Sequence, residues 1–175
     1  MKLKLALFTI LLFAGAFSAA AQRGDYMSPA EQDVVRNNQD IDARINVLTY
    51  MIDRRLIAIG IAVKASKPPL GPEDEWGAEP TGTKADLLRD IRYLLEKAVD
   101  DIDNLAGHLP EKSKEERKGV NLFNKAVKSL DASAKRWLPI LKKEYENAAE
   151  EAVHTNAASS IEFCQQIIEA SAKLK

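Results

Sequence analysis

The chain has little of the chemistry on which most catalytic and metal centres depend. It contains one cysteine and two histidines among its 175 residues. A single cysteine excludes an internal disulfide, and it also excludes covalent haem attachment through C-x-x-C-H. No G-x-S-x-G segment is present to form a nucleophile elbow. These shortages predict a protein that is not an enzyme and that carries no cofactor.

Long apolar runs are scarce beyond the first 21 residues. A membrane-spanning helix needs roughly 20 consecutive apolar residues, whereas the longest later run, Leu56 to Val63, has only eight. The 25 basic and 26 acidic residues nearly cancel, which argues against binding to nucleic acid or to an anionic membrane. No segment alternates with period two over the length of a strand, so we expect an all-α fold.

The amino-terminal segment has the three parts of a cleaved secretory signal. Lys2 and Lys4 form a short basic start, the apolar run from Leu5 to Phe17 follows, and Ser18 to Ala21 supplies small residues for a peptidase. We expect cleavage after Ala21, which makes residues 1–21 a signal peptide and residues 22–175 one helical domain. The predicted location is periplasmic or secreted.

Apolar residues recur every three to four positions in four segments, which predict helices at about 29–66, 84–106, 111–136 and 139–174. Ser28, Pro29 and Glu31 form the start signal of the first helix, since a serine cap, a proline at the first position and a glutamate three residues on make a capping box. The segment 67–82 holds four prolines and three glycines. We therefore predict an antiparallel four-helix bundle with a long first helix and one long Pro/Gly-rich loop.

A first helix of 38 residues exceeds either middle helix, so its extra turns require cover from the last helix, the long loop or a second chain. Its near-heptad spacing is typical of a coiled coil. If a partner binds, we expect the contact at the protruding end of this helix together with the loop. The partner-binding candidates are Trp76, Glu73, Asp74, Glu75 and Tyr26. Trp76 and Tyr26 have a second interpretation, in which they pin the loop onto the bundle.

Glu151 and His154 form an E-x-x-H pattern, which places a carboxylate and an imidazole on one helical face. Di-iron four-helix proteins use this element twice and add two further glutamates, and the second copy is missing here. A metal held by Glu151 and His154 is therefore an alternative to a solvated histidine. A b-type haem held by His108 or His154 with Met27 or Met51 is a further possibility.

Two other hypotheses concern apolar residues. A lipid or small hydrophobic ligand carrier would hold its ligand between helices around Leu56 to Val63. The single cysteine, Cys164, shares a helical stripe with Ile161 and Ile168. We expect its thiol to be buried as a small hydrophobic group, the alternative being a disulfide between chains.

The chain resembles the uncharacterised exported all-helical proteins of bacterial genomes. The likeness covers the signal, the segment Tyr26 to Glu31 and the stretch Asp42 to Arg55. It implies a small secreted helical bundle and no particular activity. Our sequence-based prediction is a non-enzymatic exported protein that acts by protein–protein interaction or self-association.

Overall fold

The computed structural model describes residues 25–63, 76–107 and 114–173, with side chains in the last range from residue 119 onward. These residues form five helices and no strand: α1 (Pro29–Asn37), α2 (Ile41–Ala58), α3 (Lys84–Ala106), α4 (Lys114–Glu146) and α5 (Glu151–Lys173). The all-α prediction is therefore confirmed. No helix in the described ranges is long and apolar enough to cross a membrane. The predicted signal at 1–21 lies outside these ranges.

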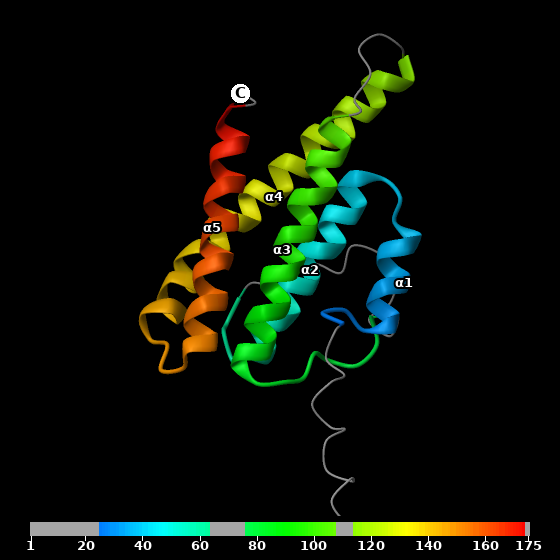
Figure 1. The fold of residues 1–175 in the computed structure, drawn as a ribbon. Helices are drawn as coiled ribbons and strands as arrows, with labels where there is room; N and C mark the ends of the chain where they lie inside the picture. Colours follow the sequence, from blue (N-terminus) through cyan, green and yellow to red (C-terminus); the bar gives the residue numbers. More distant parts are fainter. Residues whose placement is uncertain (1–24, 64–75, 108–113, 174–175) are drawn as a thin grey trace, which may run out of the picture.

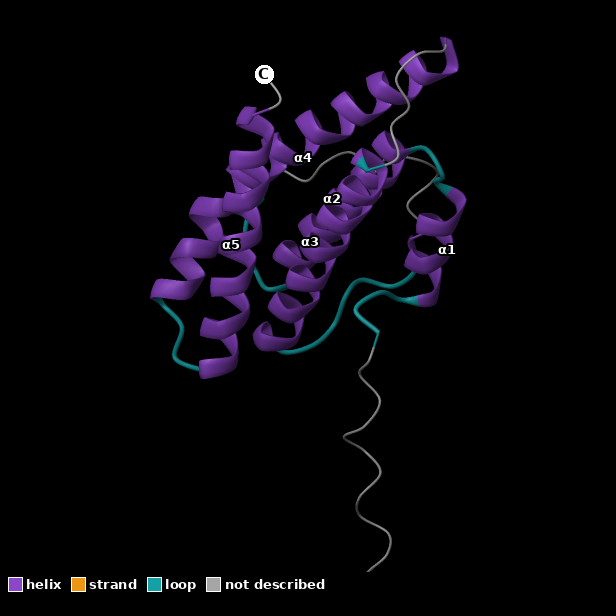
Figure 2. Ribbon diagram, turned by 45° about the horizontal axis from the view of Figure 1, so that its top comes forward, coloured by secondary structure: helices purple, strands orange, loops and turns teal. Residues whose placement is uncertain are grey.

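Four of the helices enclose the core, and α1 lies beside them (Figure 1). Helix α2 packs against α3 and α4, and α5 packs against the same two helices. The chain runs down α2, up α3, down α4 and up α5 in Figure 1, so consecutive helices are antiparallel. Figure 2 shows α1 against α2, away from α5.

The predicted first helix at 29–66 is wrong, because the structure divides it at Asn38. Asn38 is extended (φ −101°, ψ 91°) and ends α1. Its side-chain Nδ2 donates to the carbonyl of Val34 at 2.7 Å, and Arg44 Nε donates to the carbonyl of Asn38 at 3.1 Å. Asparagine favours such local hydrogen bonds over helical ones. The polar position in the apolar stripe therefore marks a bend.

Helix α2 ends at Ala58 instead of continuing to residue 66. Gly60 has φ +83°, its N–H donates to the carbonyl of Ile57 at 2.9 Å, and the N–H of Ile61 donates to the carbonyl of Leu56 at 3.0 Å. This pair of hydrogen bonds is a Schellman motif, which requires a left-handed residue after the helix. Residues 56–63 are thus a helix end and a turn, not the centre of a buried helix.

Helix α3 has the bounds predicted for the helix at 84–106. Helix α4 does not end at the predicted residue 136. Thr83 and Asp86 close a reciprocal capping box at the start of α3. Helix α4 continues through Pro139 to Glu146, so the predicted break at 137–139 and the predicted last helix at 139–174 are wrong. Proline removes one hydrogen bond within a helix. The buried side chains of Trp137 and Leu141 on either side provide packing that keeps the helical path.

A single hydrophobic cluster joins all five helices. It includes Val34 of α1, most inward residues of α2 and α3, and Cys164 of α5. Trp76, which precedes α3, is also part of this cluster. Cys164 is a free, fully buried thiol, as the helical stripe predicts.

Replacing Gly60 by alanine tests the turn that ends α2. A Cβ at φ +83° is strained even though no atom lies within 4 Å of it, so we expect the free energy of unfolding to fall by about 1 kcal/mol. Gly119→Ala is the matched control, because Gly119 lies inside α4 and a Cβ there also meets open space. That change should stabilise by about 0.5–1 kcal/mol. Equal shifts in urea denaturation would contradict the assigned turn.

Candidate functional site

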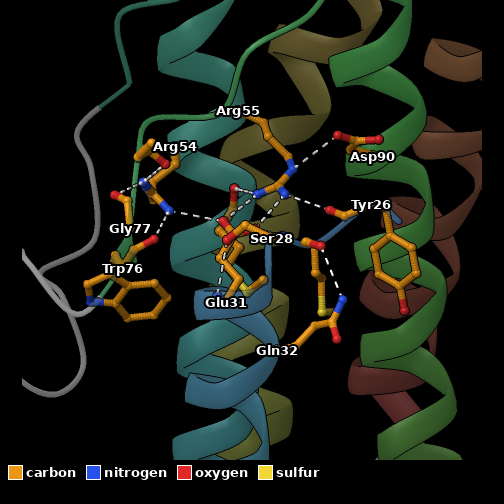
Figure 3. A network of polar contacts seen from close by, with 12 residues as sticks. Tyr26, Ser28, Glu31, Gln32, Arg54, Arg55, Trp76, Gly77 and Asp90 are labelled. Carbon is orange, nitrogen blue, oxygen red and sulfur yellow. Dashed lines mark hydrogen bonds and ion pairs between the residues drawn. The ribbon is translucent and has the colours of Figure 1, made fainter. Parts of the chain in front are cut away.

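The most concentrated chemistry in the described chain is a buried ionic network between α1 and α2 (Figure 3). Glu31 is 2% exposed, and the side chains of Arg54 and Arg55 are 5% and 3% exposed. Arg54 Nη1 donates to Glu31 Oε1 at 3.0 Å. Arg55 donates to both carboxylate oxygens, at 3.0 and 2.9 Å. One carboxylate thus receives two guanidinium groups.

The start of α1 sets the position of the Glu31 carboxylate. Glu31 Oε2 accepts from the N–H of Ser28 at 2.9 Å, and Ser28 Oγ accepts from the N–H of Glu31 at 3.2 Å. This capping box is the one that the sequence predicts. The sequence does not reveal that the same carboxylate also binds two arginines 23 and 24 residues away.

The two arginines also bind backbone carbonyls from two other segments. Arg54 donates to the carbonyls of Trp76, Gly77 and Ala78 at 2.9 to 3.3 Å. Arg55 donates to the carbonyl of Tyr26 at 2.6 Å. Since buried carbonyls need donors, these contacts attach the chain before α1 and the chain before α3 to α2.

Asp90 of α3 completes the charge balance of the network. Its Oδ2 lies 3.6 Å from Arg55 Nε, and its Oδ1 lies 3.6 Å from Arg89 Nη2. Burial raises the pKa of the Asp90 carboxyl, and the nearby charge of Arg55 opposes that rise. Four charges therefore meet here: Glu31, Arg54 and Arg55 are buried, and Asp90 is partly buried, with a side chain that is 15% exposed. Because these groups bind one another and the backbone, the arrangement joins segments rather than exposing a reactive group.

A second buried acid joins α2 to α4. Asp53 is fully buried and accepts from Arg136 Nη2 at 2.9 and 3.1 Å and from Trp137 Nε1 at 2.8 Å. Asp53, Arg54 and Arg55 are thus three consecutive charged residues that are all buried. The sequence-based prediction did not identify these three residues as buried. The signal that could have indicated it is their place within the apolar stripe of a helix.

An apolar hollow lies between α3, α4 and α5, with a volume of about 270 Å³. Its floor consists of buried side chains from α4 and α5, including Phe123, Val127 and Ile167. The exposed side chains of Asp103 and Lys173 stand on its rim. The full lining is Val99, Ile102, Asp103, Ala106, Phe123, Val127, Leu130, Gln166, Ile167, Ala170, Ser171 and Lys173.

A second hollow of about 560 Å³, lined by both polar and apolar residues, adjoins a different face of α3. Arg44 and Asp101 line it, with Nη1 and Oδ1 3.8 Å apart. The same Asp101 oxygen accepts from Lys97 at 3.1 Å. Of the charged side chains that line this hollow, Arg44 and Asp101 are engaged with each other and Asp40 is exposed. The apolar hollow is the better candidate for a contact with apolar side chains.

The aromatic candidates for partner binding are packed against the chain itself. Trp76 is 1% exposed and meets the ring of Tyr50 edge-on, with centroids 4.6 Å apart. Tyr26 is half-buried, its ring lies 5.5 Å from that of Tyr93, and burial followed by nearby acidic charge raises its pKa. The loop-pinning interpretation therefore describes Trp76. Glu73, Asp74 and Glu75 lie outside the described residues.

The metal candidates Glu151 and His154 are both exposed at the start of α5. The ring of His154 lies 3.9 Å from that of Tyr145. The described ranges contain no group of three histidine, cysteine, aspartate or glutamate residues arranged to hold a metal ion. Of the haem candidates, His108 lies outside these ranges, and Met27 and Met51 are buried in the hydrophobic cluster.

Residues 56–63, proposed as a ligand site on the basis of sequence, line neither hollow. Comparisons with protein-family models, with curated proteins and with solved structures found no match to this chain.

Glu31→Gln tests the ionic network. It leaves two buried arginines facing a neutral amide, so we expect the free energy of unfolding to fall by about 3 kcal/mol or more. Asp33→Asn is the control, because its ion pair with Arg36 is exposed at both ends and is worth less than about 1 kcal/mol. Similar losses for the two variants in urea denaturation would show that burial of the pair contributes nothing.

Asp90→Asn isolates the effect of the raised pKa. The folded protein binds this proton more tightly than the unfolded chain does, so the wild type loses stability as pH rises from the ordinary value of 3.8 toward the raised pKa. The asparagine of the variant does not titrate. The stability of the variant relative to the wild type should therefore rise as pH increases from 3.8 to the raised pKa of Asp90, and should stay constant at higher pH. Unfolding free energies measured from pH 3 upward test this, and a flat difference would contradict it.

Cys164 should be unreactive in the folded protein. Burial raises the pKa of its thiol to about 12, and the thiolate is the reactive form. We expect a disulfide reagent such as DTNB to modify it only after unfolding in urea. Rapid modification of native protein at pH 8 would contradict the buried position.

Proposed function

We propose that this chain is an exported, non-enzymatic helical protein that acts by binding a partner protein. In this proposal residues 1–21 are removed as a signal, and α2–α5 act as the antiparallel four-helix bundle that the sequence predicts. The partner inserts apolar side chains of an amphipathic helix into the apolar hollow between α3, α4 and α5.

The hollow carries this proposal. Three helices form its walls, its floor is apolar, and its volume of about 270 Å³ is below the roughly 300–1,000 Å³ that is usual for sites of drug-sized ligands. A hollow of this size fits a few side chains of a helix that crosses it, which is a common mode of peptide recognition. The sequence-based expectation of a partner contact at the protruding end of a long first helix has lost its basis, because that helix is divided into α1 and α2.

Charge on the rim specifies the partner further. Asp103 stands on the α3 side of the hollow, and Gln166 and Lys173 stand on the α5 side. A partner helix with a basic residue facing Asp103 and an acidic residue facing Lys173 matches this arrangement. Such rim charges set orientation and association rate more than affinity.

Photocrosslinking at the rim tests the proposal. A photoreactive amino acid replaces Ala170, which lines the hollow, or Ala172, which is exposed on the same helix and lines neither hollow. Each protein is incubated with the exported proteins of the source organism, and the crosslinked segments are identified by mass spectrometry. We expect an amphipathic helical segment to crosslink from position 170 and not from position 172.

The identified segment is then synthesised and its binding measured by calorimetry. Ala170→Trp fills the hollow and should weaken binding at least about tenfold, since one lost anchor at a binding hot spot costs 1–2 kcal/mol or more, whereas Ala172→Trp should not. Equal crosslinking from both positions, or equal binding by both variants, would overturn the proposal. A small apolar molecule found in the hollow by native mass spectrometry would instead favour a ligand carrier.

A further inference from the structure

The connection between α1 and α2 consists of three residues, Asn38 to Asp40, and it permits a second arrangement of the chain. Among the described helices α1 contacts only α2. Glu31 of α1 binds Arg54 and Arg55 of α2, and Arg55 also binds the carbonyl of Tyr26, which precedes α1. Residues 25–37 are therefore an arm that joins the rest of the chain through the ionic network, the ring contact of Tyr26 with Tyr93, and the hydrophobic cluster.

The linker contains neither proline nor glycine, and the apolar spacing runs through it. Val34, Ile41 and Ile45 are separated by seven and four residues, which is helical register. Residues 29–58 consequently fit one straight helix about 45 Å long at 1.5 Å per residue. The apolar spacing by itself favours that straight form, whereas the structure shows the bent form.

Only local bonds hold the bend. Asn38 bonds to the carbonyl of Val34, the carbonyl of Asn38 accepts from Arg44, and Gln39 Nε2 donates to the carbonyl of Arg36. Asp40 occupies the N-cap of α2, yet its side chain makes no capping hydrogen bond. A straight helix would replace these contacts by backbone bonds across the linker.

Straightening carries α1 away from the arginines of its own chain. We infer that two copies of this chain exchange residues 25–37, so that Glu31 of each copy binds Arg54 and Arg55 of the other. The exchange recreates every contact of the ionic network and changes only the linker, which is why exchange of an element is a low-cost route to a dimer. This inference does not depend on the apolar hollow. It assigns self-association of the chain to the exchange of residues 25–37.

Linker variants provide the first test, with dimer measured by native mass spectrometry from micromolar to millimolar protein. Gln39→Pro suits the bent form, because Asn38 has an extended backbone and not the helical one that a following proline disfavours. It interrupts the straight helix, so the dimer association constant should fall at least about a hundredfold. Gln39→Ala/Asp40→Ala changes two exposed residues and raises helix propensity, so the constant should rise about tenfold.

Charge reversal distinguishes exchange from any other dimer. Glu31→Lys alone gives the buried site a net charge of plus two, and Arg55→Glu alone gives it minus two. When the two variants are mixed, an exchanged heterodimer contains one wild-type site and one balanced reversed site. The double variant Glu31→Lys/Arg55→Glu, in one chain, shows whether the reversed pair is compatible with folding.

A one-to-one heterodimer in the mixture, with no homodimer of either variant alone, supports the exchange. Failure of the mixture to form it, when the double variant folds, overturns the inference. If the double variant does not fold, the linker variants decide. A wild type and a Gln39→Ala/Asp40→Ala variant that both stay monomeric at millimolar concentration also overturn it, as does a dimer that Gln39→Pro leaves unchanged.

Discussion

The structure depends on one buried carboxylate held between two arginines. Glu31 caps α1 and at the same time receives Arg54 and Arg55 from α2. With their remaining donors the two arginines bind backbone carbonyls of the segment before α1, at Tyr26, and of the segment before α3, at Trp76 to Ala78. Removal of Glu31 leaves two buried guanidinium groups without their shared carboxylate, which is far more costly than the net gain from the intact network.

This network explains why Trp76 lies inside the protein. The carbonyl of Trp76 is bound by Arg54, and its ring packs against Tyr50 in the hydrophobic cluster. An aromatic residue in a Pro/Gly-rich stretch therefore completes the core. The apolar hollow between α3, α4 and α5, where we propose that a partner binds, lies toward the other end of α3. The ionic network stabilises the fold, and the apolar hollow is the site of the proposed binding.

Local chemistry was readable where neighbours in sequence decide the structure. The capping signal at Ser28, the bounds of α3 and the buried position of Cys164 all follow from spacing and residue type. The candidate site was not readable in this way. The ionic network joins residues 23 and more positions apart, and the hollow arises from the packing of three helices, so neither leaves a local pattern.

The sequence by itself determined that the protein is all-helical, because apolar residues recur with helical period through most of the chain. Tertiary structure decided where helices bend, stop or continue. Pro139 stays within α4 because Trp137 and Leu141 are buried beside it. The end of α1 is different, because Asn38 ends it through a local bond to Val34. Periodicity records which side chains face the core, whereas helix ends depend on hydrogen bonds and packing from other segments.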